Sequence, residues 1–167
     1  QKIMKWYYLI LLVVFMGCGS SKESTESKER KEKKELIISL ERTACYGTCT
    51  IYKMGIFSDG SAFYHGRRFV EKLGDYEFTV SKETINNILR KADENGFYEL
   101  KDKYTVKVTD LPKTITFIKS GSEKKEIIDY YGAPKILKEF ESLVDGCIDY
   151  KRMKKLTDEM IDSVSYT

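Results

Sequence analysis

A charged segment near the N-terminus most constrains this chain, because it fixes where a folded domain can begin. Residues 19–35 consist of Gly, Ser, Thr, Lys, Arg and Glu, with no apolar side chain. Such a segment has nothing to bury and is expected to be a solvated tether, roughly 20–25 Å long as a coil. The 167-residue chain then has room for one globular domain. We place it at 36–150 and assign 151–167 to an amphipathic C-terminal tail.

An apolar run precedes the tether. Residues 6–16 form eleven successive apolar positions, too few for the ~20 needed to span a bilayer but typical of a signal peptide. The stretch Phe15-Met16-Gly17-Cys18 resembles the bacterial lipobox, in which the cysteine is acylated and becomes the mature N-terminus. We therefore predict a lipoprotein signal peptide at 1–18, lipidated at Cys18 and anchored in a bacterial membrane, facing the periplasm or cell surface. A plain secretory leader or a buried amino-terminal helix is the alternative.

Charge argues against one class of partner. The chain has 29 basic and 26 acidic residues, and removal of Lys2 and Lys5 with the leader leaves 27 against 26. Nucleic-acid binding requires a concentrated basic face. We therefore expect no nucleic-acid partner.

Hairpin signals and two helical stripes predict the fold class. Asp59-Gly60 and Ser120-Gly121-Ser122 separate runs of strand-forming residues. The expected strands are 36–42, 51–58, 61–66, 76–80, 113–119 and 123–130, with a further extended piece at 67–73. The order is a β-meander, a helix, a β-hairpin and a second helix. This order predicts an α+β fold, an antiparallel sheet built from hairpins with two main helices packed on one face.

Each helix has its own boundary signals. Ser81 is a suitable N-cap for the first helix, and Asn95-Gly96 a suitable end. Gly132-Ala133-Pro134 opens the second helix. The apolar stripe of the first comprises Ile85, Ile88, Leu89 and Ala92, and that of the second Ile136, Leu137, Phe140, Leu143, Val144, Cys147 and Ile148.

Five spaced motifs resemble a known family. They are Cys45-Tyr-Gly-Thr-Cys49, Asp59-Gly60 with Tyr64-His65-Gly66, Gly96-Phe97, Thr109-Asp110-Leu111-Pro112, and Asp129-Tyr-Tyr-Gly-Ala-Pro134. In this order they are similar to a bacterial domain family of unknown function, which more often has Pro where this chain has Thr50. The resemblance covers about residues 36–150. It implies an exported or membrane-tethered α+β domain and no assigned activity.

The cysteines allow several interpretations. Cys45 and Cys49 can bond only if the chain turns tightly, because bonded Cα atoms lie about 4.4–6.8 Å apart. In an oxidising envelope a structural disulfide is our leading interpretation, ahead of reduced packed thiols, a redox-active pair or a metal site. The thioredoxin-type spacing is absent, and His65 is the sole histidine available as a further metal ligand. Cys147 is expected in the core.

Carboxylates and aromatic residues near strand ends are explained first by turn formation and edge packing, and a binding rim for a ligand or peptide is the alternative. The candidate rim residues are Arg67, Arg68, Tyr104, Asp110, Asp129 and Tyr130. A Cys49–His65–Asp110 nucleophile has no support from spacing.

No Ser-x-x-Lys, Gly-x-Ser-x-Gly or His-Glu-x-x-His motif occurs, so we assign no catalytic residue, cofactor or metal. The first hypothesis is a membrane lipoprotein with a non-enzymatic domain that binds another envelope protein or a cell-wall component. The alternative is a thiol/disulfide-dependent enzyme or redox module using Cys45 and Cys49. A small-ligand sensor or inhibitor is a third hypothesis.

Overall fold

The computed structural model describes residues 34–107 and 110–157. The predicted signal peptide with Cys18, the tether up to residue 33, and the tail from residue 158 lie outside the described residues. So does Thr109.

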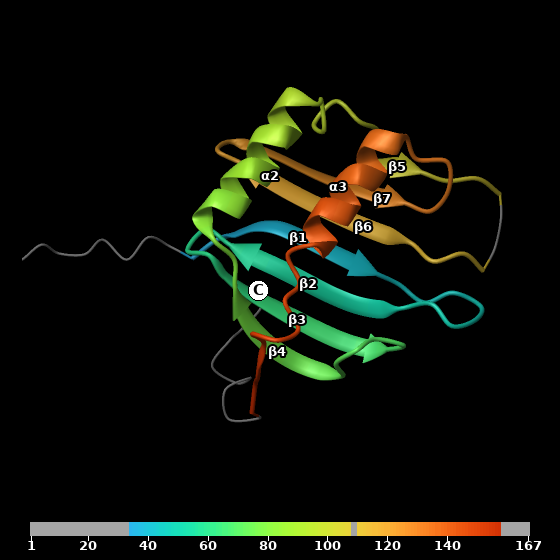
Figure 1. Cartoon of the computed structure of the whole chain (residues 1–167). Helices are drawn as coiled ribbons and strands as arrows, with labels where there is room; N and C mark the ends of the chain where they lie inside the picture. The colour runs from blue at the N-terminus through green and yellow to red at the C-terminus, as the bar shows by residue number, and fades with distance from the viewer. Residues whose placement is uncertain (1–33, 108–109, 158–167) are drawn as a thin grey trace, which may run out of the picture. The chain divides into compact units, whose positions relative to one another are not determined.

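One sheet organises the described part of the chain (Figure 1). Its order is β5-β7-β6-β1-β2-β3-β4-β8. The strands are β1 (Leu36–Arg42), β2 (Ile51–Phe57), β3 (Ser61–Arg68), β4 (Gly74–Thr79), β5 (Lys103–Tyr104), β6 (Thr114–Ser120), β7 (Glu123–Asp129) and β8 (Lys154–Lys155). All pairings are antiparallel except that of β5 with β7. The expectation of an α+β domain with a mostly antiparallel sheet is confirmed.

Two parts of the sheet differ from expectation. Residues 69–73 bend instead of continuing the meander, because Phe69 adopts a left-handed backbone with φ +54°. The two-residue strands β5 and β8 were not predicted, since so short a run has no alternation to detect.

The two described helices begin and end close to the predicted residues. In α2 (Lys82–Glu94) the Ser81 side chain accepts a hydrogen bond from Thr84 N at 3.1 Å, and Asn95 N bonds Lys91 O. Gly96 follows with φ +67°, which favours glycine. The second helix, α3 (Lys135–Asp145), starts directly after Pro134.

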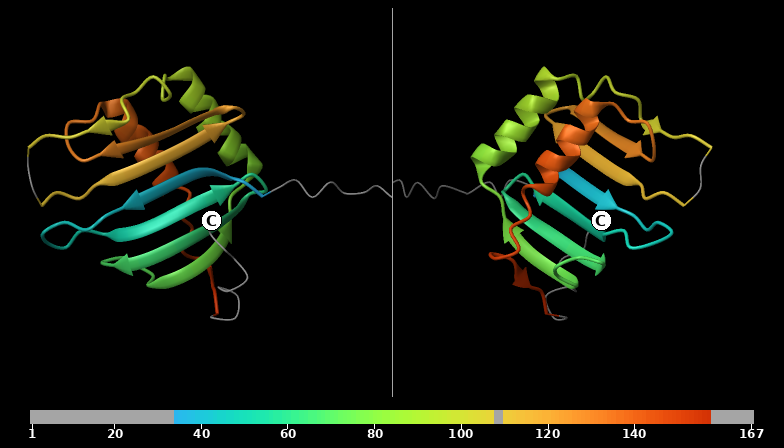
Figure 2. Two further views of the ribbon diagram at one scale, coloured as in Figure 1. Left: turned by 180° about the vertical axis from the view of Figure 1, so that it is seen from behind. Right: turned by 45° about the vertical axis from the view of Figure 1, so that its right-hand side comes forward.

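Both helices contact the sheet and each other. The first packs against β6 and α3, and the second also packs against β1. The view turned by 45° in Figure 2 shows the two helices side by side. The core that they share with the sheet has twenty buried hydrophobic side chains: Ile38, Leu40, Tyr52, Met54, Ile56, Ala62, Tyr64, Phe78, Val80, Ile85, Ile88, Ala92, Phe97, Ile118, Ile127, Leu137, Phe140, Val144, Met153 and Leu156.

Candidate functional site

Four chain connections meet at one end of the sheet. Register places Arg42 opposite both Tyr52 and Thr114, and Thr114 opposite Asp129. Ile51 likewise faces Arg68. Four connections therefore lie together at the right of Figure 1: 43–50, 69–73, the described residues of 105–113, and 130–134. We call residues 43–50, 67–73, 105–107, 110–113 and 130–135 the loop end.

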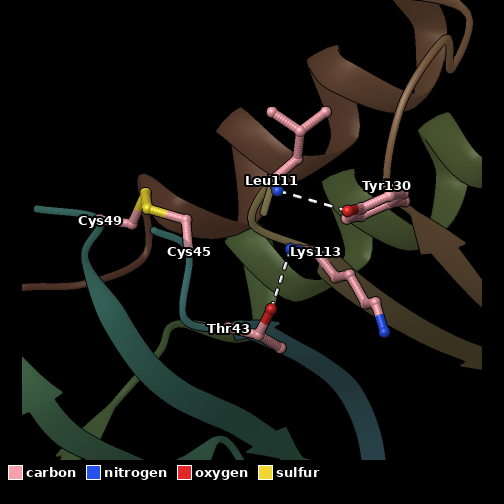
Figure 3. Close-up of a disulfide and its surroundings, with 6 residues drawn as sticks. All are labelled: Thr43, Cys45, Cys49, Leu111, Lys113 and Tyr130. Atoms are coloured by element: carbon pink, nitrogen blue, oxygen red, sulfur yellow. Dashed lines mark hydrogen bonds between the residues drawn. A yellow bond between two sulfur atoms is a disulfide. The ribbon is translucent and has the colours of Figure 1, made fainter. Parts of the chain in front are cut away.

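A disulfide closes the loop between β1 and β2 (Figure 3). Cys45 and Cys49 are bonded, with Cα atoms 5.8 Å apart. The predicted tight turn is thus present, and Gly47 at φ +146° provides it. The loop is also held to the neighbouring connection, because Thr43 N donates to Lys113 O at 2.9 Å and Tyr46 N donates to Asp110 O at 3.2 Å.

A second connection completes this framework. Leu111 N donates to the Tyr130 hydroxyl at 3.3 Å, and Lys113 N donates to Thr43 Oγ1 at 2.9 Å, as Figure 3 shows. The Lys113 ammonium lies 5.8 Å from the Tyr130 ring centre. The β1–β2, β5–β6 and β7–α3 connections are therefore tied together by hydrogen bonds from backbone N–H groups.

The loop end exposes hydrophobic side chains. Tyr46 is 92% exposed at the tip of the disulfide loop. Five large hydrophobic side chains are exposed in the described part of the chain, and all five belong to the loop end: Tyr46, Phe69, Leu73, Val106 and Tyr131. Single exposed hydrophobic residues are ordinary on a protein surface, but their confinement to one end of the sheet is a candidate interaction site.

The same loops are basic. Their sequence contains six basic side chains and two acidic ones. The basic residues are Arg67, Arg68, Lys72, Lys107, Lys113 and Lys135, and the acidic ones are Glu71 and Asp110. The Arg68 guanidinium lies 5.0 Å from the Phe69 ring centre, so positive charge and exposed aromatic surface are adjacent.

The structure brings most of the predicted rim residues to this end. Arg67 and Arg68 are exposed where β3 ends, and Asp110 is exposed in the 105–113 connection. The half-buried Tyr104 accepts a hydrogen bond from Lys101 N at 3.2 Å, so its hydroxyl helps to hold its own loop. Tyr130 is half-buried and accepts from Leu111 N.

Asp129 requires a correction, because it does not lie on a surface rim. It is 2% exposed, and its side chain points from β7 to the underside of α3. There the Lys138 ammonium pairs with Asp129 and lies 3.4 Å from Glu141 Oε2. Glu141 is also 2% exposed. Two buried carboxyls thus share one lysine.

This arrangement changes the protonation of Glu141. Burial, reinforced by the Asp129 charge and a hydrogen bond to it, raises the pKa of Glu141 to about 7 despite the opposing effect of Lys138. Two ionised carboxylates at this place would repel each other, whereas the protonated form of Glu141 is able to donate a hydrogen bond to Asp129. Burial disfavours the Lys138 cation, but Asp129 and Glu141 outweigh it and raise the pKa of Lys138.

A second polar group joins α3 to the sheet. Arg42 Nε donates to the Tyr52 hydroxyl at 3.0 Å, Arg42 Nη1 donates to Thr114 Oγ1 at 3.1 Å, and Nη2 pairs with Asp145. The Tyr52 hydroxyl also donates to Asp145. Burial and this carboxylate raise the pKa of Tyr52, and Asp145 more than offsets the burial of Arg42 and raises its pKa. The group fixes the loop-end side of β1, β2 and β6 beneath α3.

Sequence reasoning missed this buried polar layer. Glu141 and Asp145 lie on a helix whose buried face was predicted from its apolar residues alone. A signal was present in the sequence: Lys138, Glu141 and Asp145 recur at the spacing that places side chains on one side of a helix.

Other candidates lie elsewhere. His65 Nδ1 is 2.5 Å from Asp75 Oδ1, across the β3–β4 pairing. Cys147 is half-buried against the core, where burial raises the pKa of its thiol to about 11. It lines a cleft of about 680 Å³ between the start of α2 and residues 146–152. In the described ranges, no three His, Cys, Asp or Glu side chains are placed to share a metal ion, and no helix is long and apolar enough to cross a membrane.

Residues 36–148 match the family described as DUF6438, a domain of unknown function. The chain belongs to this family. The predicted membership of a family without assigned activity is thereby confirmed. No curated protein matches the chain. The loop end described above is formed entirely within the residues that match DUF6438.

Proposed function

We propose that this DUF6438 protein is a lipid-anchored lipoprotein of the bacterial envelope with a non-catalytic binding domain, and that the loop end is its binding surface. One observation carries the proposal: the five large exposed hydrophobic side chains of the described residues all belong to the loop end. Grouped exposed hydrophobic side chains mark interaction sites.

The position of the tether supports this assignment. The described chain enters at Lys34 and Glu35, next to the start of β1 at Leu36. The loop end lies at the other end of this strand, beyond Arg42. An anchor at Cys18 would therefore attach the domain by the end opposite to its proposed binding surface.

The arrangement of the helices also leaves the surface accessible. The proposal places α2 and α3 on the same face of the sheet, which is supported by their mutual contact and by the views in Figures 1 and 2. Helices on one face do not cover the strand ends. The Cys45–Cys49 bond and the contacts of Thr43 with Lys113 keep the loops in place before binding, which lowers the entropy cost of association.

Mass spectrometry tests the anchor. Full-length protein is extracted from bacterial membranes, its free thiols are alkylated before reduction, and its intact mass and peptides are measured. We expect acyl chains on Cys18 and alkylation of Cys147 but not of Cys45 or Cys49. An unlipidated protein would refute the anchor. Alkylation of both Cys45 and Cys49 would favour the thiol-dependent alternative.

Photo-crosslinking in cells tests the binding surface. A photoreactive amino acid is placed at Tyr46 or Tyr131 in the loop end, or at the exposed Asn86 of α2 as a matched control. We expect adducts of defined mass from the two loop-end positions and none from position 86. Equal labelling from all three positions, or none from the loop end, would refute a specific surface there.

A further inference from the structure

Positive charge is concentrated in the loop end. Residues 34–157 contain 22 basic and 19 acidic side chains, a net charge of +3. The loop end alone has six basic and two acidic side chains, a net charge of +4. The remainder of these residues is therefore close to neutral, at −1. A partner that is attracted to this end must present negative charge.

The hydrophobic side chains protrude on separate loops. Tyr46, Phe69, Val106 and Tyr131 come from four different connections, and the fifth, Leu73, shares the connection of Phe69. None of the five lines the clefts of about 680, 400 and 240 Å³ that the described residues form. Protein hot spots are typically packed into pockets that exclude water. Protruding aromatic and aliphatic tips beside Lys and Arg have instead the chemistry of side chains that enter the interface of a bilayer.

From these observations we infer that the loop end docks on the surface of an anionic bilayer, an inference that rests on the proposed binding function of this end. Tyr46, Phe69 and Tyr131 enter the headgroup region. Arg67, Arg68 and the loop lysines meet the lipid phosphates. Basic side chains near an anionic bilayer and apolar groups in its interface act together, since neither alone gives firm attachment.

The proposed anchor is compatible with this contact. A tether of residues 19–35 spans roughly 20–25 Å as a coil and up to about 60 Å when fully extended. The seven residues of β1 span about 23 Å. The tether is thus long enough for the domain to turn its loop end to the bilayer that holds the lipid. Because the acyl chains already hold the domain near the bilayer, the loop end meets the lipid surface at a high effective concentration. A weak contact of the loop end is therefore sufficient for docking.

Depth-dependent fluorescence quenching tests the inference. Full-length protein is reconstituted in phosphatidylcholine vesicles with or without phosphatidylglycerol, using lipids with brominated acyl chains as quenchers. Trp6, the sole tryptophan, lies in the predicted signal peptide that is removed from the lipidated protein, so the mature chain allows a single reporter, Tyr46→Trp, with Asn86→Trp on α2 as the matched control. We expect a blue shift and quenching of Tyr46→Trp in phosphatidylglycerol vesicles and neither change for Asn86→Trp.

The charges are tested by the double variant Arg67→Gln/Arg68→Gln, with Arg90→Gln/Lys91→Gln on α2 as the control pair. We expect the loop-end pair to lower the ratio of docked to undocked domains by up to about thirtyfold, and the control pair to leave it unchanged. Absence of Tyr46→Trp quenching, equal quenching of both reporters, or equal quenching without phosphatidylglycerol would overturn the inference. If quenching is absent but photo-crosslinking in cells gives protein adducts from position 46, the proposed binding function is retained and the partner is a protein rather than a bilayer.

Discussion

Replacement of Glu141 by Gln provides a test of the buried polar layer. In the folded protein this carboxyl has a pKa of about 7, against 4.5 for an ordinary Glu, so the folded state holds its proton more tightly than the unfolded state. The resulting stabilisation is fully present below about pH 4.5 and is lost as the pH rises through about 7. A tenfold change in proton affinity corresponds to about 1.4 kcal/mol. The free energy of unfolding should therefore fall by about 3 kcal/mol in total, mostly between pH 5 and pH 8.

The variant Glu141→Gln has the shape of the protonated acid and can donate to Asp129 at every pH. We expect it to have the stability of the wild type near pH 5 and to exceed it by about 2–3 kcal/mol at pH 8. Urea unfolding at intervals between these pH values measures the difference.

The matched control is Glu139→Gln, which removes an exposed carboxylate of the same helix. We expect it to retain the pH dependence of the wild type. Parallel stability curves for the wild type and Glu141→Gln between pH 5 and pH 8 would refute the assignment of the shared proton. Asp129→Asn provides a second check, because loss of the neighbouring charge should move the pH-dependent step below 7.

Three further changes test other parts of the structure. Arg42→Lys loses the guanidinium geometry that contacts Tyr52, Asp145 and Thr114 at once, and we expect urea unfolding to show a loss of about 1–2 kcal/mol. The double variant Cys45→Ser/Cys49→Ser should remain folded by circular dichroism but lose about 2 kcal/mol, since the bond closes a short loop on a domain with its own core. In Gly66→Ala the new Cβ would lie 2.0 Å from Lys72 O, and thermal unfolding should show a loss of about 2–3 kcal/mol.

Local signals predicted much of the fold. Ser81 and Asn95-Gly96 set the ends of α2 through bonds to their own neighbours, and Asp59-Gly60 forms its hairpin for the same reason. The pairing of β1 with β6 involves residues such as Arg42 and Thr114 that are 72 positions apart. No local pattern encodes such a pairing. The sequence therefore predicted a meander and a hairpin along the chain, but not which strands of the two are neighbours in the sheet.

The candidate site was only partly predictable. Cys45 and Cys49 were identified from their spacing, and Arg67 and Arg68 from their charge. Tyr46 and Tyr131, however, lie at the same end of the sheet only because the strand register places their loops there. Asp129 was assigned to the surface rim and Glu141 was not identified, because acidic residues are rarely buried unless they are paired. Their shared partner Lys138 is recognisable only once α3 is placed against the sheet.

The central position of β1 determines the order in which the domain can assemble. Once residue 79 has been synthesised, β1 can pair with β2 along one side and the meander to β4 can close. Its other side has no partner until β6 is complete at Ser120. During that interval β1 is an unprotected edge strand that contains Ile37, Ile38 and Leu40, and such edges recruit other chains. Long-range pairing of this kind is also slow. Aggregation of incomplete chains during synthesis should therefore begin at β1, and a segment that covers this edge until β6 arrives would raise the yield of folded protein.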